Sequence, residues 1–196
     1  MTGLFRAGDG ETPLSEEDKE GLIPSYVATR GELNAEEQHN ILEARFWVRS
    51  RKNRIDILDE TTLRDLHRRM FGRVWRWAGE WRERETSIGA DPRQVPILMR
   101  QLADDVRYWI ANDTYLLDEI AIRYHHRFEQ IHPFRNGNGR TGRFAADILA
   151  RKLGATPFTW GAGIQDKRAA RQQYLDALRT ADRDLDFGRL TKFARS

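Results

Sequence analysis

A histidine, a glycine-rich loop and two arginines stand close together within the segment 132–143, which reads HPFRNGNGRTGR. Gly137 and Gly139 are poor residues for a helix interior but suit a turn in which backbone N–H groups converge. Apolar residues then repeat at helical spacing, so we expect a helix over about 139–153. Because the start of a helix offers unpaired N–H donors, the loop predicts an anion site.

Two arginines in the first turn of that helix favour a phosphate as the anion. Arg140 and Arg143 are three residues apart, so they share a helix face. Cations there oppose the helix dipole at a cost of about 0.3–1 kcal/mol each, which an anion bound between them would offset. Guanidinium groups hold phosphate oxygens through two parallel hydrogen bonds. Two arginines at this spacing usually lie on a solvated helix face. The neighbouring glycine-rich loop is what favours phosphate binding here.

His132 is the side chain of the segment that can accept a proton near neutral pH. It precedes Pro133, which drives its backbone out of the helical region, so a helix over about 115–131 should end there with the imidazole facing the loop. We predict that His132 deprotonates a hydroxyl, which then attacks a phosphate held by the loop. Phe134 is expected to face the core and anchor the loop.

The segment 132–143 resembles the signature of the Fic family, His-Pro-Phe-x-(Asp/Glu)-Gly-Asn-Gly-Arg-x-x-Arg, and matches every fixed position except one. The segment 66–82 looks like the stretch that precedes the family's flap, so the likeness covers about residues 30–193. The opening, 21–34, looks like the Fic subgroup called mobile mystery protein B. The resemblance implies a mostly α-helical, Fic-like bundle with a small β-hairpin flap beside the active-site loop.

Fic proteins mostly transfer AMP from ATP to a hydroxyl of a target protein. The resemblance therefore implies a protein adenylyltransferase that acts on a Ser, Thr or Tyr hydroxyl, with ATP as substrate and His132 as general base. It also implies a Mg²⁺ ion that bridges the phosphates, and it places Tyr174 and Asp182 near the adenine. The implied phosphate-binding residues are Gly137, Asn138, Gly139, Arg140 and Arg143.

Asn136 is the position that departs from the family pattern. The family usually has Asp or Glu here as a ligand of the metal ion. An amide oxygen can coordinate Mg²⁺, but hard cations favour carboxylates, so we expect weaker metal binding at Asn136. Two alternatives to AMP transfer remain open: a nucleotide-binding regulator that transfers poorly, and a variant that transfers phosphate, UMP or phosphocholine.

Residues 83–96 contain a strong turn signal at Gly89-Ala90-Asp91-Pro92, from which we predict a short β-hairpin. In Fic proteins a hairpin flap holds the target segment as an added strand. Ser87, Ile88 and Gly89 are therefore expected to contact the target. The alternative is an ordinary exposed loop.

Many Fic proteins carry an inhibitory helix, (Ser/Thr)-x-x-x-Glu-(Gly/Asn), whose glutamate pairs with the last arginine of the signature. The nearest copy in this chain lies at 28–34, and its Glu32 is predicted to pair with Arg143 and to inhibit nucleotide binding. The alternative is that Glu32 is a surface residue before an N-cap at Asn34.

The composition predicts one domain. The 196 residues are 39% hydrophobic, with six Trp and nine Phe, which can fill a core over 21–196 behind a flexible N-terminal tail over 1–20. The chain has no cysteine, no 18-residue apolar run and no apolar signal core, so we expect a cytoplasmic protein that does not enter a membrane. Helices are expected over about 34–51, 60–74, 97–112, 115–131, 139–153, 166–182 and 186–194.

The chain has a net charge of +3, and an Arg- and Trp-rich stretch at 68–84 is similar to a nucleic-acid surface. The aromatics there alternate with charge as core residues would, so nucleic-acid binding is not favoured. The subgroup resemblance adds a small helix-turn-helix, antitoxin-like protein as a candidate partner. His39 and His67 have no recognisable partners, and His125 and His126 are adjacent on a helix and so cannot share one metal. All four are expected to be structural.

Overall fold

The computed structural model describes residues 20–27, 29–51 and 54–196. The predicted N-terminal tail lies outside them, except for Glu20. The elements are α2 (Arg30–Ser50), α3 (Glu60–Phe71), the 3₁₀ helix η2 (Pro92–Gln94), α4 (Val95–Ala111), α5 (Leu117–Ile131), α6 (Asn138–Lys152), α7 (Lys167–Asp184) and α8 (Gly188–Ala194). The predicted mostly α-helical fold is confirmed.

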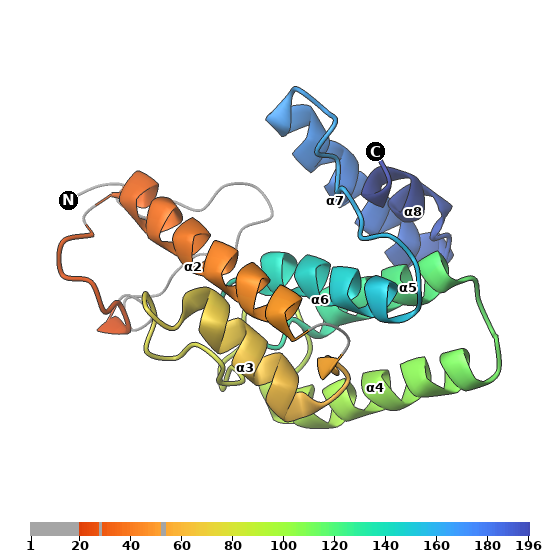
Figure 1. Cartoon of the computed structure of the whole chain (residues 1–196), viewed down its shortest axis with the longest axis horizontal. Helices are drawn as coiled ribbons and strands as arrows, with labels where there is room; N and C mark the ends of the chain where they lie inside the picture. Colours follow the sequence, from red (N-terminus) through yellow and green to blue (C-terminus); the bar gives the residue numbers. More distant parts are fainter. Residues whose placement is uncertain (1–19, 28, 52–53) are drawn as a thin grey trace.

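The helices form a bundle around α5 and α6, which pack against each other at its centre (Figure 1). The helix α4 packs on α5, α2 packs across α3, and α3 contacts α6. Near the C-terminus, α7 and α8 pack together and α8 reaches α5. The segment 132–137 joins α5 to α6, and its Gly137 packs against Phe71 of α3.

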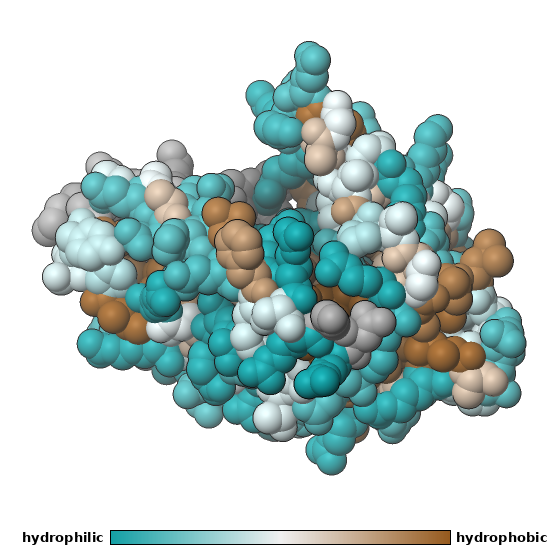
Figure 2. Space-filling model, in the orientation of Figure 1, coloured by the Kyte–Doolittle hydropathy of each residue, from teal (hydrophilic) through white to brown (hydrophobic). Residues whose placement is uncertain are grey.

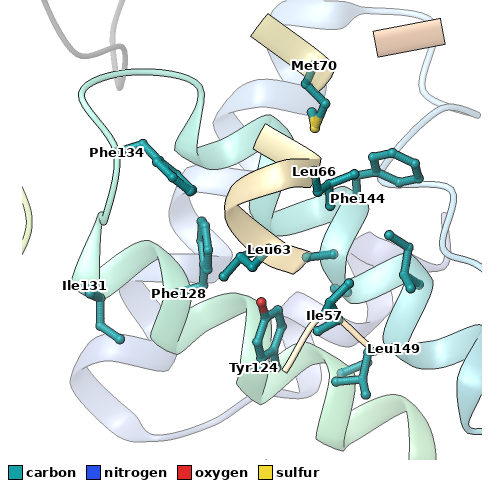
Figure 3. Close-up of a cluster of buried hydrophobic side chains, with 14 of the residues drawn as sticks. Ile57, Leu63, Leu66, Met70, Tyr124, Phe128, Ile131, Phe134, Phe144 and Leu149 are labelled. Atoms are coloured by element: carbon teal, nitrogen blue, oxygen red, sulfur yellow. The ribbon is translucent and has the colours of Figure 1, made fainter. Parts of the chain in front are cut away.

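Aromatic and aliphatic side chains from α3, α5 and the 132–137 loop fill the core below that segment. Figure 3 shows Phe134 of the loop directed toward Phe128 of α5, with Leu63 and Leu66 of α3 beside them. Phe134 has no exposed surface, which confirms the prediction that it anchors the loop in the core. A fully buried Phe side chain contributes about 1.5–3 kcal/mol relative to an exposed one.

The helix α2 starts at Arg30, earlier than the predicted start at about residue 34. Thr29 caps α2 through a capping box, in which Thr29 Oγ1 accepts from Glu32 N–H and the Glu32 carboxylate accepts from Thr29 N–H. The predicted N-cap at Asn34 was therefore wrong, because the Thr-x-x-Glu pattern is the stronger helix start. The predicted end of α5 is confirmed: the helix ends at Ile131, and His132 is its left-handed C-cap with φ 53°.

The predicted β-hairpin over 83–96 is absent, and the only β pairing in the described chain is the isolated bridge Leu22–Trp75. The segment is an irregular loop followed by η2, whose start is capped by Asp91. Two prolines, Pro92 and Pro96, lack the N–H that a strand ladder needs. The backbone of the loop bonds to the end of α5 rather than to itself, through Ala90 N–H and the carbonyl of Ile131 at 3.2 Å.

The face drawn in Figure 2 is largely hydrophilic, which agrees with a mean hydropathy of −0.73. Hydrophobic side chains gather over α2, where Leu42 and Phe46 are exposed, and over the turn between α4 and α5, where Leu116 and Leu117 are exposed. Among the described helices, none combines the length and the apolar character that crossing a bilayer requires.

Candidate functional site at the α5–α6 loop

The loop between α5 and α6 is held by its own hydrogen bonds. The Asn138 side chain accepts from Phe134 N–H and donates to the Phe134 carbonyl, both at 2.8 Å. Gly137 has φ 78°, and a Cβ there would lie 2.7 Å from the Phe71 ring. Gly137 has no side chain to cap α6, so the N–H groups of the first turn face the loop without a side-chain cap. The start of α6 therefore offers N–H donors at the loop, and the anion cradle there stays a prediction.

The predicted base lies at the opposite end of the same loop. His132 is 5% exposed, and its imidazole forms a hydrogen bond with the backbone of Glu129. Burial, together with the nearby charge of Arg82, lowers the pKa of His132 to about 4 although the bond to Glu129 acts in the opposite direction. The ring is therefore neutral at pH 7, which is the state that can accept a proton.

The two arginines of the α6 start contact different helices. The Arg140 guanidinium pairs with Glu37 of α2 at 2.5 Å and lies over the Phe71 ring. The Arg143 guanidinium lies 5.1 Å from the centre of the Tyr174 ring on α7. The predicted arginine face is thus flanked by α2 and α3 on one side and by α7 on the other.

Glu37 is a site residue that sequence reasoning missed. It is 4% exposed, and besides Arg140 it accepts a hydrogen bond from Trp75 Nε1 at 2.7 Å. Its position on α2 follows the buried stripe formed by Leu33, Ala44 and Val48. A glutamate on the buried stripe of α2 was the available signal, because a buried carboxylate needs a charged or hydrogen-bonding partner.

Glu32, the residue we predicted to contact Arg143, lies in the first turn of α2. Its carboxylate accepts from Thr29 N–H at 2.9 Å at the start of α2, in the capping box described above. The acidic residue that α2 brings to the signature is Glu37, and its partner is Arg140. Residues 29–34 of the inhibitory-motif copy form the start of α2, and the pairing of Glu32 with Arg143 stays a prediction.

A buried polar cluster surrounds Arg143. Glu129 and His125 of α5 lie on one side of it, and His125 Nε2 is 3.0 Å from the Tyr174 hydroxyl. Burial raises the pKa of Glu129 to about 7 even though Arg143 acts to lower it. A Cβ at Gly142 would lie 2.7 Å from Glu129 Oε1, so the glycine makes room for the carboxyl group. Tyr174 thus lies beside Arg143, and its contact with a nucleotide stays a prediction.

Asp182, the second residue predicted near the adenine, has other partners. Its carboxylate lies 2.9 Å from His126 Nε2 and accepts from Gln130 Nε2 at 2.9 Å. Both partners are on α5, so Asp182 ties the end of α7 to that helix.

His67 is the second residue that we did not assign to the site. Its Nδ1 accepts from Gly79 N–H at 2.9 Å, so Nε2 carries the proton and donates to the Asn136 carbonyl at 3.1 Å. Its ring stacks on Phe134 with centroids 3.7 Å apart. Burial lowers the pKa of His67 to about 3, which keeps the ring neutral. We expected a structural histidine without a recognisable partner, and the structure gives it a partner in the loop itself.

Asn136 has one side-chain oxygen to offer a metal ion. This oxygen accepts from Gly137 N–H at 2.7 Å, and an amide oxygen has a second lone pair. No group of three or more His, Asp or Glu side chains that could hold a metal lies within the described chain. The donor set fits a Mg²⁺ ion held mainly by phosphate oxygens, with Asn136 as a neutral protein ligand.

The residues predicted to contact a target lie beside His132. Ser87, Ile88 and Gly89 are exposed in the loop that precedes η2, which we call the flap loop, residues 84–90. Gly89 has φ 114°, and a Cβ there would lie 2.7 Å from His132 Cβ. The flap loop therefore lies against the backbone of Ile131 and the side chain of His132 although it forms no hairpin.

A family model, that of the Fic/DOC family, matches residues 57–150. The chain is 28% identical over 138 residues to protein adenylyltransferase Fic of Culex quinquefasciatus, covering 66% of this chain and 26% of that protein. It is 31% identical over 106 residues to protein adenylyltransferase fic-1 of Caenorhabditis elegans, covering 50% and 21%. The chain thus spans about a quarter of the length of the curated relatives it matches.

Solved structures share the fold. The BepC protein of Bartonella tribocorum with bound AMPPNP aligns with a TM-score of 0.69 and 16% identity, covering 92% of this chain and 97% of that one. A Fic domain containing signaling protein from Bacteroides thetaiotaomicron aligns with a TM-score of 0.65 and 20% identity, covering 84% and 63%. The family match covers the loop and the helices that hold it, so this part of the chain resembles the Fic/DOC family in sequence, and the solved structures share its fold.

Proposed function

We propose that this chain transfers AMP from ATP to a hydroxyl group of a target protein. The observation that carries the proposal is the neutral, buried imidazole of His132 at one end of a loop whose other end is an uncapped helix N-terminus with two arginines. The curated relatives are named protein adenylyltransferases, and one structural neighbour is titled as holding AMPPNP. Both support a nucleotide in this loop.

In the proposed reaction, His132 takes the proton from a Ser, Thr or Tyr hydroxyl of the target. The hydroxyl oxygen then forms a bond to the α-phosphorus of ATP, and the bond from that phosphorus to the bridging oxygen breaks. Pyrophosphate leaves with the bonding electrons, and the target carries AMP as a phosphodiester. The N–H groups of the α6 start, with Arg140 and Arg143, stabilise the negative charge on the phosphates.

We propose Asn136 as the protein ligand of a Mg²⁺ ion, through the amide oxygen that also accepts from Gly137 N–H. The ion would neutralise phosphate charge when it is bound. Tyr174 is proposed to contact the nucleotide, since it lies next to Arg143. Ser87, Ile88 and Gly89 are proposed to contact the target because the flap loop adjoins His132.

A nucleotide-binding regulator is the second candidate, and the observation that favours it is Asn136. Without a carboxylate at this position the metal is held more weakly, and transfer could be slow while binding persists. A variant that transfers phosphate, UMP or phosphocholine is the third. We also propose that the chain belongs to the mobile mystery protein B subgroup, has a small helix-turn-helix protein as partner and is cytoplasmic.

One labelling experiment separates these candidates. Cell lysate is incubated with the protein, MgCl₂ and ATP that carries ³²P at either the α or the γ position. AMP transfer predicts α label on a lysate protein and no γ label. Label from the γ position alone would mean phosphate transfer, and ATP binding without any label would mean a regulator. Incorporation from labelled UTP or CDP-choline, and not from ATP, would identify another transferred group.

A further inference from the structure

Arg82 is a buried arginine whose hydrogen-bond acceptors are backbone carbonyls. It is 2% exposed. Its Nε donates to the His132 carbonyl at 2.6 Å, and Nη2 donates to the Ile131 carbonyl at 3.3 Å. On the other side, Nη1 donates to the Arg84 carbonyl at 2.8 Å, and Nη2 also donates to the Ala90 carbonyl. Four donor–acceptor pairs thus converge on one guanidinium group.

These carbonyls belong to two segments that are far apart in the chain. Arg84 and Ala90 are the two ends of the flap loop, and 131–132 is the junction at which α5 ends in the base. Two backbone bonds join the same segments: Arg82 N–H to the Pro133 carbonyl at 2.9 Å, and Ala90 N–H to the Ile131 carbonyl at 3.2 Å. Arg82 therefore closes the flap loop and fastens it to the backbone of the base.

An arginine that only filled space in the core would not need four carbonyls around its guanidinium group. A buried cation loses its hydration, and carbonyl dipoles aimed at it are what offset that loss. Among the described residues Arg82 forms no ion pair, although Glu85 and Asp91 are close enough to favour its charged form. Only the planar fork of arginine can reach carbonyls on both sides at once, because a lysine has a single ammonium group.

The position of the flap loop bears directly on access to His132. A Cβ at Gly89 would lie 2.7 Å from His132 Cβ and 2.8 Å from Arg82 Nη2, so the backbone of the flap loop packs closely against both residues. Ile88, half exposed, lies next to this contact on the outer side of the loop. A polypeptide that delivers a hydroxyl to the imidazole from this side has to lie along the flap loop.

We propose that Arg82 is a positioning residue, whose guanidinium fixes the flap loop against the backbone of His132 and so sets where a target polypeptide lies relative to the base. This inference rests on the proposed function for its catalytic consequence. The attachment of the flap loop to the His132 backbone by Arg82, which we call the clamp, is a property of the free protein. Arg82 touches neither the α6 N-terminus nor the two arginines of the signature in any contact described above, so ATP binding should not depend on it.

The test compares Arg82→Lys, which keeps the charge and loses the fork, with Arg82→Met, which keeps only the stem. Arg100→Lys is the matched control, because Arg100 is an exposed arginine on α4 that donates to a single carbonyl, that of Pro96. Amide hydrogen exchange measured by mass spectrometry should become at least tenfold faster in the peptide that covers 84–91 in Arg82→Lys, and should not change in Arg100→Lys. Circular dichroism checks that each variant is folded. If Arg82→Met does not fold, the result for Arg82→Lys decides the test.

Transfer kinetics provide the second readout. At saturating ATP, Arg82→Lys should raise the lysate protein concentration that gives half-maximal α label at least fivefold and lower the maximal rate, while the Kd for ATP from calorimetry stays within twofold. Unchanged exchange in the flap loop, or a loss of ATP affinity equal to the loss of transfer, would overturn the inference. If the parent protein transfers no label, the proposed function fails, and the exchange and ATP-binding measurements still decide whether Arg82 is the clamp.

Discussion

The His67 imidazole and the Asn136 carbonyl are joined by a 3.1 Å hydrogen bond, although 69 residues separate them in the chain. The bond links α3 to the loop that carries the signature. Because the other ring nitrogen accepts from Gly79 N–H, the tautomer is fixed and His67 can serve only as a donor to the loop. The shape of the site thus depends on a histidine that does not belong to the signature.

His67→Phe tests this dependence while it keeps the stacked ring on Phe134. The substitution leaves Gly79 N–H and the Asn136 carbonyl without their partner, and an unsatisfied buried group costs about 1–3 kcal/mol. We expect the free energy of unfolding in urea to fall by about 2–4 kcal/mol and the affinity for ATP to weaken. His39→Phe, on the exposed face of α2, is the control. Unchanged stability would mean that water replaces the imidazole at both groups.

The pH dependence of stability should report His125. Burial holds its pKa well below the ordinary value of 6.5, so the unfolded chain binds a proton below pH 6.5 when the folded protein does not. Stability from this group is complete above pH 6.5 and is lost as the pH falls. The charged and titratable groups that face it are His126 and Glu129 of α5, Arg143 of α6 and Tyr174 of α7.

We therefore expect His125→Phe to lower the slope of unfolding free energy against pH by up to about 1.4 kcal/mol per unit between pH 6.5 and 5. Urea unfolding at several pH values measures that slope. The raised pKa of Glu129 gives a slope of the opposite sign, so the comparison is always made with the parent protein. An identical slope in parent and variant would show that His125 is protonated in the folded state.

His132→Ala should remove AMP transfer and keep ATP binding. General base catalysis contributes about 10²–10⁴-fold to rates, so α-label incorporation should fall by at least a hundredfold. The Kd for ATP, measured by calorimetry, should stay within a factor of about three, because the phosphates are assigned to the α6 start. His39→Ala serves as the control. Transfer at the parent rate would show that another group takes the proton.

Asn136→Asp should lower the Mg²⁺ requirement. The carboxylate keeps an oxygen where the amide accepts from Gly137 N–H and adds the charge that Mg²⁺ favours. We expect the Mg²⁺ concentration for half-maximal labelling to fall by about tenfold. Asn112→Asp, at the exposed end of α4, controls for the added charge. A slower reaction with the same Mg²⁺ requirement would mean that the Asn136 amide donates a bond that the reaction needs.

Glu37→Gln should tighten ATP binding. The substitution preserves an acceptor for Trp75 Nε1 and removes the negative charge 2.5 Å from the Arg140 guanidinium. Because that charge opposes an anion at the α6 start, the Kd for ATP should fall by up to about tenfold, which is 1.4 kcal/mol. Glu43→Gln, an exposed change on the same helix, is the control. Weaker ATP binding would instead indicate that Glu37 holds Arg140 in its binding position.

Local patterns predicted much of the fold. The apolar repeat placed α4 through α7 within a few residues, and the proline after His132 placed the end of α5 at Ile131. The base, the glycines and the arginines of the site follow one another within twelve residues, so their proximity was a property of the sequence itself.

The remaining parts of the site depend on packing between distant segments. Glu37 and Arg140 are 103 residues apart, and Arg82 lies 50 residues before His132, so no local pattern pairs them. The hairpin prediction was wrong for the same reason: carbonyls that a hairpin would use internally accept hydrogen bonds from Arg82. A turn signal says where the chain reverses, but it does not say which donors the reversed backbone will find.

The two hydrogen bonds between the Asn138 side chain and the backbone of Phe134 have a consequence for nucleotide affinity. Since the peptide units between them are held by this side chain, the loop reaches its working shape when the protein folds. Association with a nucleotide then loses little backbone entropy, and more of the interaction with phosphate remains as net binding energy. Preorganisation of this kind resides in an asparagine amide, far smaller than the anion it prepares for.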